Sequence, residues 1–181
     1  MKIKIGVMGS AGNGAETNQA LRSKAIALGQ SLAKQKAILL TGATTGVIYL
    51  VGKTAHDLGM FHIGVSPGAN INEHVETYKL PTDACDALIY TGFGLKGRNV
   101  VLVRSCDIVL FIAGATGSLN EFTIAHDESK IIGCLTGTGG VADEANYLLD
   151  HFSQKPDLKI FQNADPDELV TACLSAIPEN K

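Results

Sequence analysis

The sequence predicts an α/β fold with a doubly wound, mostly parallel sheet that carries helices on both faces. Apolar strand segments alternate along the chain with segments of helical periodicity. The strands are almost continuously apolar, as expected of parallel strands buried on both faces. Gly-rich loops follow directly after several of them. Because the 181 residues show no linker and no internal repeat, we expect a single domain over residues 1–181.

The first half of the chain is expected to alternate strands and helices from its first residues. Lys2–Met8 starts with a partly alternating pattern and becomes apolar, which indicates a strand. Leu21, Ala25, Leu28 and Leu32 recur at helical spacing, and Gly59 is a stop signal for the second helix. The expected elements are a strand over 2–8, a helix over 17–36, a strand over 38–40, a helix over 47–58 and a strand over 62–66.

The second half continues the alternation after a polar, irregular segment. Residues 69–87 are expected to form a flap over one edge of the sheet. The elements expected beyond it are a strand over 87–90, a helix over 98–105, a strand over 108–112, a helix that carries Glu121, a strand over 131–135, a helix over 143–152, a strand over 159–161 and a helix over 166–177.

Composition excludes several classes of function. A net charge of −3 without a basic run argues against nucleic-acid binding, and no apolar stretch approaches the length of a membrane span. The chain enters a strand at once, without a signal-peptide pattern. The four cysteines are widely spaced and the histidines are scattered, which indicates reduced, buried thiols, a cytoplasmic protein and no metal site.

The Gly-rich loops are expected to meet at one edge of the sheet. The loops Gly9–Gly14, Gly42–Gly46, Gly92–Gly97 and Gly114–Gly117 all follow strands, and Gly137–Gly140 is expected to join them. In doubly wound folds this carboxyl edge is where ligands bind. Backbone N–H groups in such loops and at helix N-termini hold phosphate. The sequence therefore predicts a ligand that carries a phosphate or a nucleotide.

Two familiar nucleotide motifs are not supported. A dinucleotide site requires the spacing G-x-G-x-x-G and an acidic residue roughly 20 residues further on. The first loop has a different spacing, and no acidic residue lies between Glu16 and Asp57. Gly52-Lys53-Thr54 resembles the end of a P-loop, but Val47 stands where the leading glycine would be. We therefore assign that segment to the middle of a helix.

The strand over 108–112 is followed by a loop and a helix that carries Glu121, expected in its first turn. Ser118 and Glu121 have the spacing of a capping box, so capping and catalysis both remain open for them. Arg98 follows Gly97 at an expected helix N-terminus, where the helix dipole disfavours a cation. An anionic ligand or a carboxylate partner would explain its position. Asn99 and Thr44 are each candidates for a ligand contact or for a cap.

The segments Gly97-Arg-Asn99 and Ala113-Gly-Ala-Thr-Gly-Ser-Leu-Asn-Glu121 together resemble the LOG-like family, whose motif is P-G-G-x-G-T-x-x-E with an upstream arginine. The Arg-Asn pair is most similar to the bacterial branch that includes molybdenum cofactor carrier proteins. The resemblance implies a Rossmann-like fold and a homodimer or higher homo-oligomer. In the enzymes of the family it implies hydrolysis of a nucleoside 5′-monophosphate to free base and ribose 5-phosphate, with no cofactor required.

Matched to the family motif, Arg98 and Glu121 correspond to the catalytic pair. The positions expected to bind phosphate or nucleotide are Gly9, Ser10, Gly42, Thr44, Gly46, Asn99, Gly114, Thr116, Gly117 and Ser118. Three positions depart from the motif: Ala113 replaces proline, Ala115 replaces glycine and Ser118 replaces threonine. A positive φ would be costly at Ala115, so the departures put the hydrolase assignment in doubt more than the fold.

Two functions remain open at this point. Retention of Arg98 and Glu121 narrowly favours a nucleotide-binding protein with hydrolase activity on N-glycosyl bonds of a nucleoside monophosphate. The alternative is a protein that binds a phosphorylated pterin, the molybdenum cofactor, a nucleotide or an oxyanion without cleaving it. The altered segment 113–115 favours this alternative.

Overall fold

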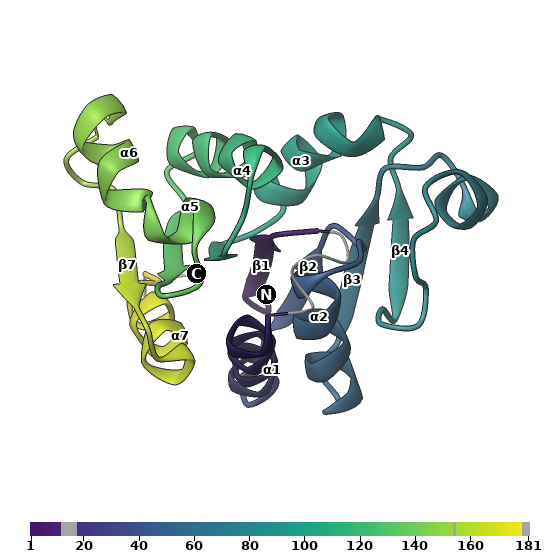
Figure 1. Cartoon of the computed structure of the whole chain (residues 1–181), viewed down its shortest axis with the longest axis horizontal. Helices are drawn as coiled ribbons and strands as arrows, with labels where there is room; N and C mark the ends of the chain where they lie inside the picture. The colour runs from purple at the N-terminus through teal and green to yellow at the C-terminus, as the bar shows by residue number, and fades with distance from the viewer. Residues whose placement is uncertain (12–17, 154, 179–181) are drawn as a thin grey trace.

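The computed structural model describes residues 1–11, 18–153 and 155–178. Its centre is a seven-stranded sheet in the order β4-β3-β2-β1-β5-β6-β7, in which every neighbouring pair is parallel (Figure 1). The expected α/β fold with a parallel sheet is therefore confirmed. The strands are β1 (Lys4–Gly9), β2 (Ile38–Thr41), β3 (His62–Ser66), β4 (Ala87–Tyr90), β5 (Ile108–Ile112), β6 (Ile131–Leu135) and β7 (Ile160–Asn163).

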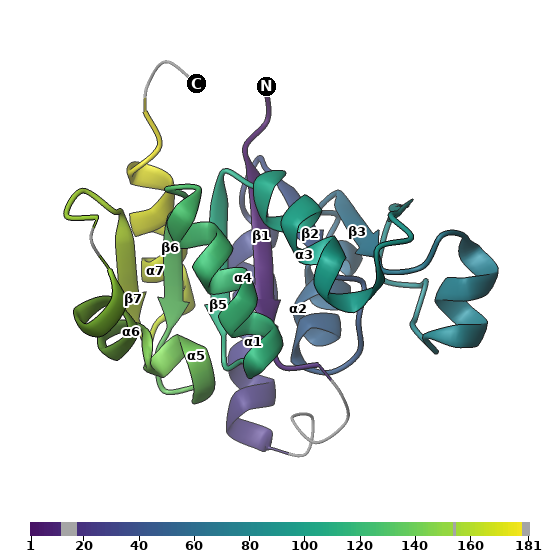
Figure 2. The same cartoon turned by 90° about the horizontal axis from the view of Figure 1, so that it is seen from above.

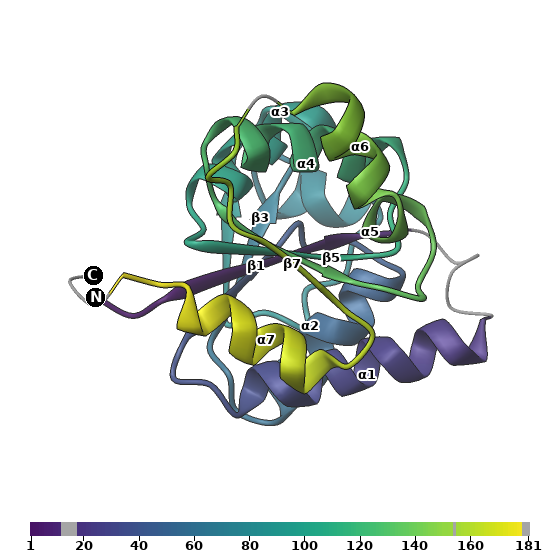
Figure 3. The same cartoon turned by 90° about the vertical axis from the view of Figure 1, so that its left-hand side faces the viewer.

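Helices cover both faces of the sheet (Figure 3). One face carries α1 (Gln19–Ala33), α2 (Val47–Asp57) and α7 (Pro166–Ser175). The other carries α3 (Gly94–Arg104), α4 (Thr116–Asp127), α5 (Gly140–Asp143) and α6 (Ala145–Phe152).

The core has two layers because side chains alternate along each strand. Val7 and Leu110 belong to the cluster under α1, α2 and α7, whereas Met8 and Phe111 belong to the cluster under α3 and α4. Each of these side chains is buried, and burial of a large apolar side chain stabilises the fold by roughly 1.5–3 kcal/mol. The sheet is thus fixed from both sides around β1 and β5.

The strand order reverses beside β1. The chain runs outward from β1 to β4 on one side and then returns to place β5 on the other side of β1 (Figure 2). A crevice beyond the carboxyl ends of the strands at such a switch point is the usual ligand site of doubly wound folds. The loops that follow β1, β2 and β5 open at this point.

Three expected elements differ from those in the structure. The helix expected over 98–105 is α3, which begins at Gly94 because the Gly94 N–H donates to the Pro67 carbonyl oxygen. The helix expected over 143–152 is divided into α5 and α6 at Glu144. The flap segment includes a short π-helix, η2 (Glu73–Thr77), so it is more regular than its polar sequence predicts.

No helix within the described ranges is long and apolar enough to cross a membrane. The four cysteines are free thiols, and burial raises the pKa of each thiol to about 12. In the part of the chain that the structure describes, no group of three or more His, Cys, Asp and Glu residues could hold a metal ion.

Candidate functional site

A cavity of about 300 Å³ lies at the carboxyl ends of β1, β2 and β5. The loops after β1 and β2, the start of α3 and the start of α4 supply its walls, so the expected meeting of these loops is confirmed for their described parts. Its lining residues are Val7, Met8, Gly9, Ser10, Ala11, Gly42, Thr44, Ile48, Leu95, Lys96, Arg98, Asn99, Ala115, Gly117, Ser118 and Glu121.

An ion pair between Arg98 and Glu121 forms one wall of the cavity. Arg98 Nη1 donates to Glu121 Oε1 at 3.1 Å and to Asn99 Oδ1 at 2.7 Å. The two charged side chains are only 7% and 8% exposed. Because α3 begins at Gly94, Arg98 stands in its second turn, and the expected position at a helix N-terminus is wrong. The sequence offered an anionic ligand or a carboxylate partner as the explanation for Arg98, and the structure supplies a carboxylate partner, Glu121.

Burial shapes the electrostatics of this pair. It raises the pKa of the Glu121 carboxyl above its ordinary value, and the positive charges of Arg98 and Lys96 act in the opposite direction. Burial lowers the pKa of Arg98, which nevertheless stays protonated because an arginine's ordinary value lies far above neutral pH. Arg98 Nε is buried and has no hydrogen-bond partner among the described residues. A buried donor without a partner costs roughly 1–3 kcal/mol, so an acceptor that reached this N–H would be stabilising.

Two glycines of the cavity are required by close approach. A β-carbon at Gly42 would overlap the Arg98 guanidinium, and one at Gly9 would overlap the carbonyl oxygen of Ile112. Gly42 therefore allows Arg98 to lie against the loop after β2, and Gly9 allows β1 and β5 to stay in register. The sequence assigned both glycines to ligand contact, and in the structure both also serve packing.

The loop between β5 and α4 reverses the chain with two left-handed residues, Ala113 (φ 53°) and Gly114 (φ 107°). The Ala113 N–H donates to Thr138 Oγ1 at 2.8 Å, and the Gly114 N–H donates to Ser10 Oγ at 3.0 Å. Ala115 has φ −117°, which any residue adopts readily. The expected backbone penalty at Ala115 therefore does not arise, and the unusual backbone lies two residues earlier.

The start of α4 faces the cavity with backbone N–H groups. The helix begins at Thr116, its N-cap residue is Ala115, and no side chain among the described residues caps it. The first N–H groups of an α-helix have no intrahelical acceptor, and Gly117 and Ser118 line the cavity. Of the two alternatives left open for Ser118 and Glu121, the capping box is wrong, because these residues are the third and sixth of α4. Glu121 accordingly lies in the second turn instead of the first.

Most of the expected ligand-binding positions lie at the cavity. Those that line it are Gly9, Ser10, Gly42, Thr44, Arg98, Asn99, Gly117, Ser118 and Glu121. Gly46, Gly114 and Thr116 are not among its lining residues: Gly46 precedes α2, Gly114 is held by Ser10, and Thr116 begins α4. Gly12 and Gly14 of the first expected loop lie outside the described residues.

Sequence reasoning missed Lys96, whose exposed side chain lines the cavity. Its Nζ lies 3.2 Å from where a β-carbon on Gly117 would be, so its charge stands at the start of α4. A lysine inside the Gly92–Gly97 loop was the available signal. Arg104, in the last turn of α3, is 62% exposed and pairs with Glu128 on the surface.

Comparisons with known proteins identify relatives of nearly the whole chain. The model of the SLOG cluster4 family matches residues 2–170. The solved structure of TM1055 has a TM-score of 0.83 at 25% identity and covers 97% of this chain and 99% of its own. The molybdenum cofactor binding protein of Rippkaea orientalis has a TM-score of 0.78 at 27% identity, and the match covers 98% of this chain and 99% of that protein. The molybdenum cofactor carrier protein of Chlamydomonas reinhardtii has a TM-score of 0.76 at 26% identity, and the match covers 97% of this chain and 98% of that protein.

Proposed function

This chain belongs to the SLOG cluster4 family, and we propose that it is a carrier that binds the molybdenum cofactor, a phosphorylated pterin, in the cavity beside β1 and β5. The family and its structural neighbours agree with the Rossmann-like, LOG-like resemblance found in the sequence. Of the two functions that the sequence left open, the carrier is favoured by two neighbours described as molybdenum cofactor proteins, which the chain matches over nearly its full length.

The observation that carries the proposal is a cavity that brings together the start of α4, Lys96 and Arg98, whose buried Nε has no hydrogen-bond partner among the described residues. A guanidinium N–H, helix N-terminal amides and the exposed ammonium of Lys96 together suit a phosphate, because charge-assisted hydrogen bonds to phosphate are among the strongest in proteins. The phosphate of the cargo would therefore lie between Lys96 and the amides of Gly117 and Ser118.

Part of the cavity lining is apolar and suits a ring system. Val7, Met8, Ile48 and Leu95 line it beside the polar groups. A volume of about 300 Å³ lies at the lower end of the range of roughly 300–1,000 Å³ that is typical of small-molecule sites. This size favours a phosphorylated ring compound over a dinucleotide, in agreement with the absence of a dinucleotide motif.

The proposal is tested by analysing the protein as purified from cells that make the cofactor. We expect molybdenum and a fluorescent oxidised pterin to be present in equal amounts on the wild-type chain. Lys96→Ala should carry less of both, whereas Lys34→Ala removes an exposed lysine at the C-cap of α1 that pairs with Asp167 and should retain the wild-type amounts. A wild-type chain that carries neither pterin nor molybdenum, even when incubated with the cofactor, would overturn the carrier proposal.

A second candidate function, phosphoribohydrolase activity, is favoured by one observation. Glu121 is a buried carboxyl group in the cavity, and it pairs with a cation. Such a carboxylate can stabilise the positive charge that develops on a ribosyl carbon as its base leaves. A panel of nucleoside 5′-monophosphates separates the two functions. The carrier proposal predicts no release of ribose 5-phosphate, and release by wild type but not by Glu121→Gln would establish the hydrolase instead.

A further inference from the structure

Two histidines outside the cavity are almost completely buried. His62 is 1% exposed and His74 is not exposed at all. His62 is the first residue of β3, and His74 belongs to η2 in the flap segment. Neither was given a role by the sequence pattern beyond a structural one. Each takes part in a chain of hydrogen bonds, and both chains contain the same groups: a backbone carbonyl, an imidazole, a side-chain hydroxyl and a backbone N–H.

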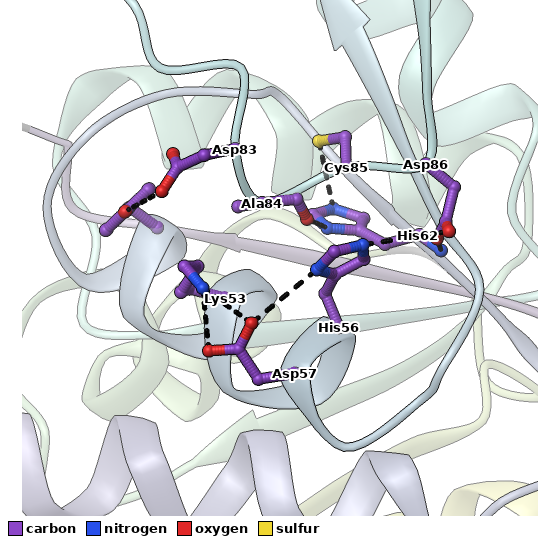
Figure 4. A network of polar contacts seen from close by, with 9 residues as sticks. Lys53, His56, Asp57, His62, Asp83, Ala84, Cys85 and Asp86 are labelled. Carbon is purple, nitrogen blue, oxygen red and sulfur yellow. Dashed lines mark hydrogen bonds and ion pairs between the residues drawn. The ribbon is translucent and has the colours of Figure 1, made fainter.

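The first chain runs from segment 81–84 through His62 to β2. His62 Nδ1 contacts the Ala84 carbonyl oxygen, and His62 Nε2 lies 2.9 Å from Thr41 Oγ1 (Figure 4 shows the Ala84 side of the ring). Because a carbonyl oxygen only accepts, Nδ1 donates and Nε2 accepts from the Thr41 hydroxyl. Thr41 Oγ1 in turn accepts the Ala43 N–H at 3.2 Å. Burial lowers the pKa of His62 to about 4, which keeps the neutral ring that this chain requires.

The second chain repeats this order one strand further along. His74 Nε2 lies 3.0 Å from the Pro81 carbonyl oxygen, and His74 Nδ1 lies 2.8 Å from Ser66 Oγ. Ser66 Oγ accepts the Gly68 N–H at 3.0 Å. In both chains the hydroxyl belongs to the last residue of a strand, and it holds the backbone two residues later. In both, the far end is a carbonyl of segment 81–84.

The two hydrogen-bond chains hold two different segments that determine the position of Arg98. Ala43, held by the first chain, follows Gly42, and the Arg98 guanidinium lies against Gly42. The second chain fixes the loop after β3, whose carbonyl oxygens at Ser66, Pro67 and Gly68 accept the N–H groups of Thr91, Gly94 and Gly92. These three donors belong to the turn that leads into α3, the helix that carries Arg98.

We infer that His62 and His74 are positioning residues for Arg98: the first fixes the loop on which the guanidinium lies, and the second fixes the start of the helix that carries it. The space around His62 is matched to the ring, since a β-carbon at Gly52 would lie 2.6 Å from His62 Cε1. The consequence for ligand binding rests on the proposed function, whereas the placement of Arg98 itself does not.

The test removes one hydroxyl at a time and observes Arg98 directly. Thr41→Val keeps the side-chain shape without the hydroxyl, Thr41→Ser keeps the hydroxyl, and Ser66→Ala interrupts the second chain. The control is Ser31→Ala, because Ser31 is as deeply buried but lies in α1. The readouts are the Arg98 Nε–H signal in ¹⁵N NMR, assigned by its loss in Arg98→Lys, and the affinity for inorganic phosphate.

We expect Thr41→Val and Ser66→Ala to shift or broaden the Arg98 signal and to weaken phosphate binding about tenfold or more, as happens when a ligand-binding side chain loses its orienting partner. Thr41→Ser and Ser31→Ala should leave both readouts unchanged. An unaltered Arg98 signal in both Thr41→Val and Ser66→Ala would overturn the inference. If the wild-type chain binds no phosphate, the phosphate site of the proposed function is contradicted, and the Arg98 signal still decides the inference.

Discussion

The loops after β2 and β5 flank β1 and have one feature in common. Each contains a buried alanine in the left-handed region, Ala43 with φ 49° and Ala113 with φ 53°. Left-handed backbone is unfavourable for a residue with a β-carbon, so each must be held by its surroundings. The loops differ in what holds them, and that difference separates their contributions to the cavity.

The loop after β2 is held by a hydroxyl and a neutral imidazole, Thr41 and His62, and it meets the side chain of Arg98. The loop after β5 is held by hydroxyls of neighbouring loops, Ser10 and Thr138, and it leads directly into the start of α4. The loop after β2 therefore constrains the position of the Arg98 guanidinium, and the loop after β5 leads to the backbone amides at the start of α4. The loop after β2 depends on His62, a group that titrates. The hydroxyl groups that hold the loop after β5 do not titrate at acidic or neutral pH.

The largest effect is expected at the Arg98–Glu121 pair, since Arg98 lies against the loop after β2 and Glu121 belongs to the helix that follows the loop after β5. Arg98→Met should leave Glu121 buried without its cation and lower the free energy of unfolding by about 3–5 kcal/mol. Adding Glu121→Gln should recover a large part of this loss, because the unpaired charge is then absent. Urea denaturation of both variants measures the two values. A loss below about 1 kcal/mol in Arg98→Met would contradict the expectation that Glu121 depends on Arg98 for charge compensation.

The next effect is a pH dependence of the free energy of unfolding that the loop after β2, and not the loop after β5, should cause. Between the ordinary histidine value of 6.5 and the folded-state value of about 4, the unfolded chain binds a proton at His62 that the folded chain does not. The free energy of unfolding should therefore fall as pH decreases through this window, by up to about 3 kcal/mol, and this contribution is constant below it. The slope should be smaller in His62→Gln and unchanged in Thr138→Val. Equal slopes in wild type and His62→Gln would contradict the dependence of the β2 loop on a neutral ring.

Glycine substitutions should affect different properties at Gly42, in the loop after β2, and at Gly140 of α5, which packs against the loop after β5. A β-carbon at Gly140, where φ is 59°, would overlap the Gly114 carbonyl, so Gly140→Ala should destabilise the fold by about 2 kcal/mol. At Gly42 the obstructed group is the end of the Arg98 side chain, which can move more readily than backbone. Gly42→Ala should accordingly lose phosphate affinity with a smaller loss of stability. Thermal denaturation and phosphate titration of both variants check this, and equal stability losses would remove the distinction.

The smallest effect concerns the exposed cation beside the loop after β5. Lys96→Ala should weaken phosphate binding by about 1 kcal/mol at low ionic strength, and the difference should shrink as salt screens the charge. Thermal stability should stay the same, because Lys96 is exposed. Phosphate titrations at two salt concentrations measure the difference. A salt-independent loss of affinity would indicate that Lys96→Ala disturbs the loop rather than its charge.

The sheet was predictable from sequence because buried parallel strands such as Ile108–Ile112 are continuously apolar. Helix starts were not, since Gly94 and Thr116 begin helices through backbone contacts made with distant loops or without any capping side chain. The partnership of Arg98 with Glu121 could be anticipated only as the need of a cation for an anion. The histidine chains could not be foreseen, because their partners are backbone carbonyls and hydroxyls that only the folded chain brings together.

Ala113 also constrains how this sequence can change over evolutionary time. The LOG-like motif has proline at this position, but a proline ring fixes φ near −65° and has no N–H to donate to Thr138. A single substitution that restored the motif would break the loop, so any return to it would require compensating changes in the neighbouring loops first. Sequence searches that insist on the motif proline would accordingly overlook chains whose loop is built in this way.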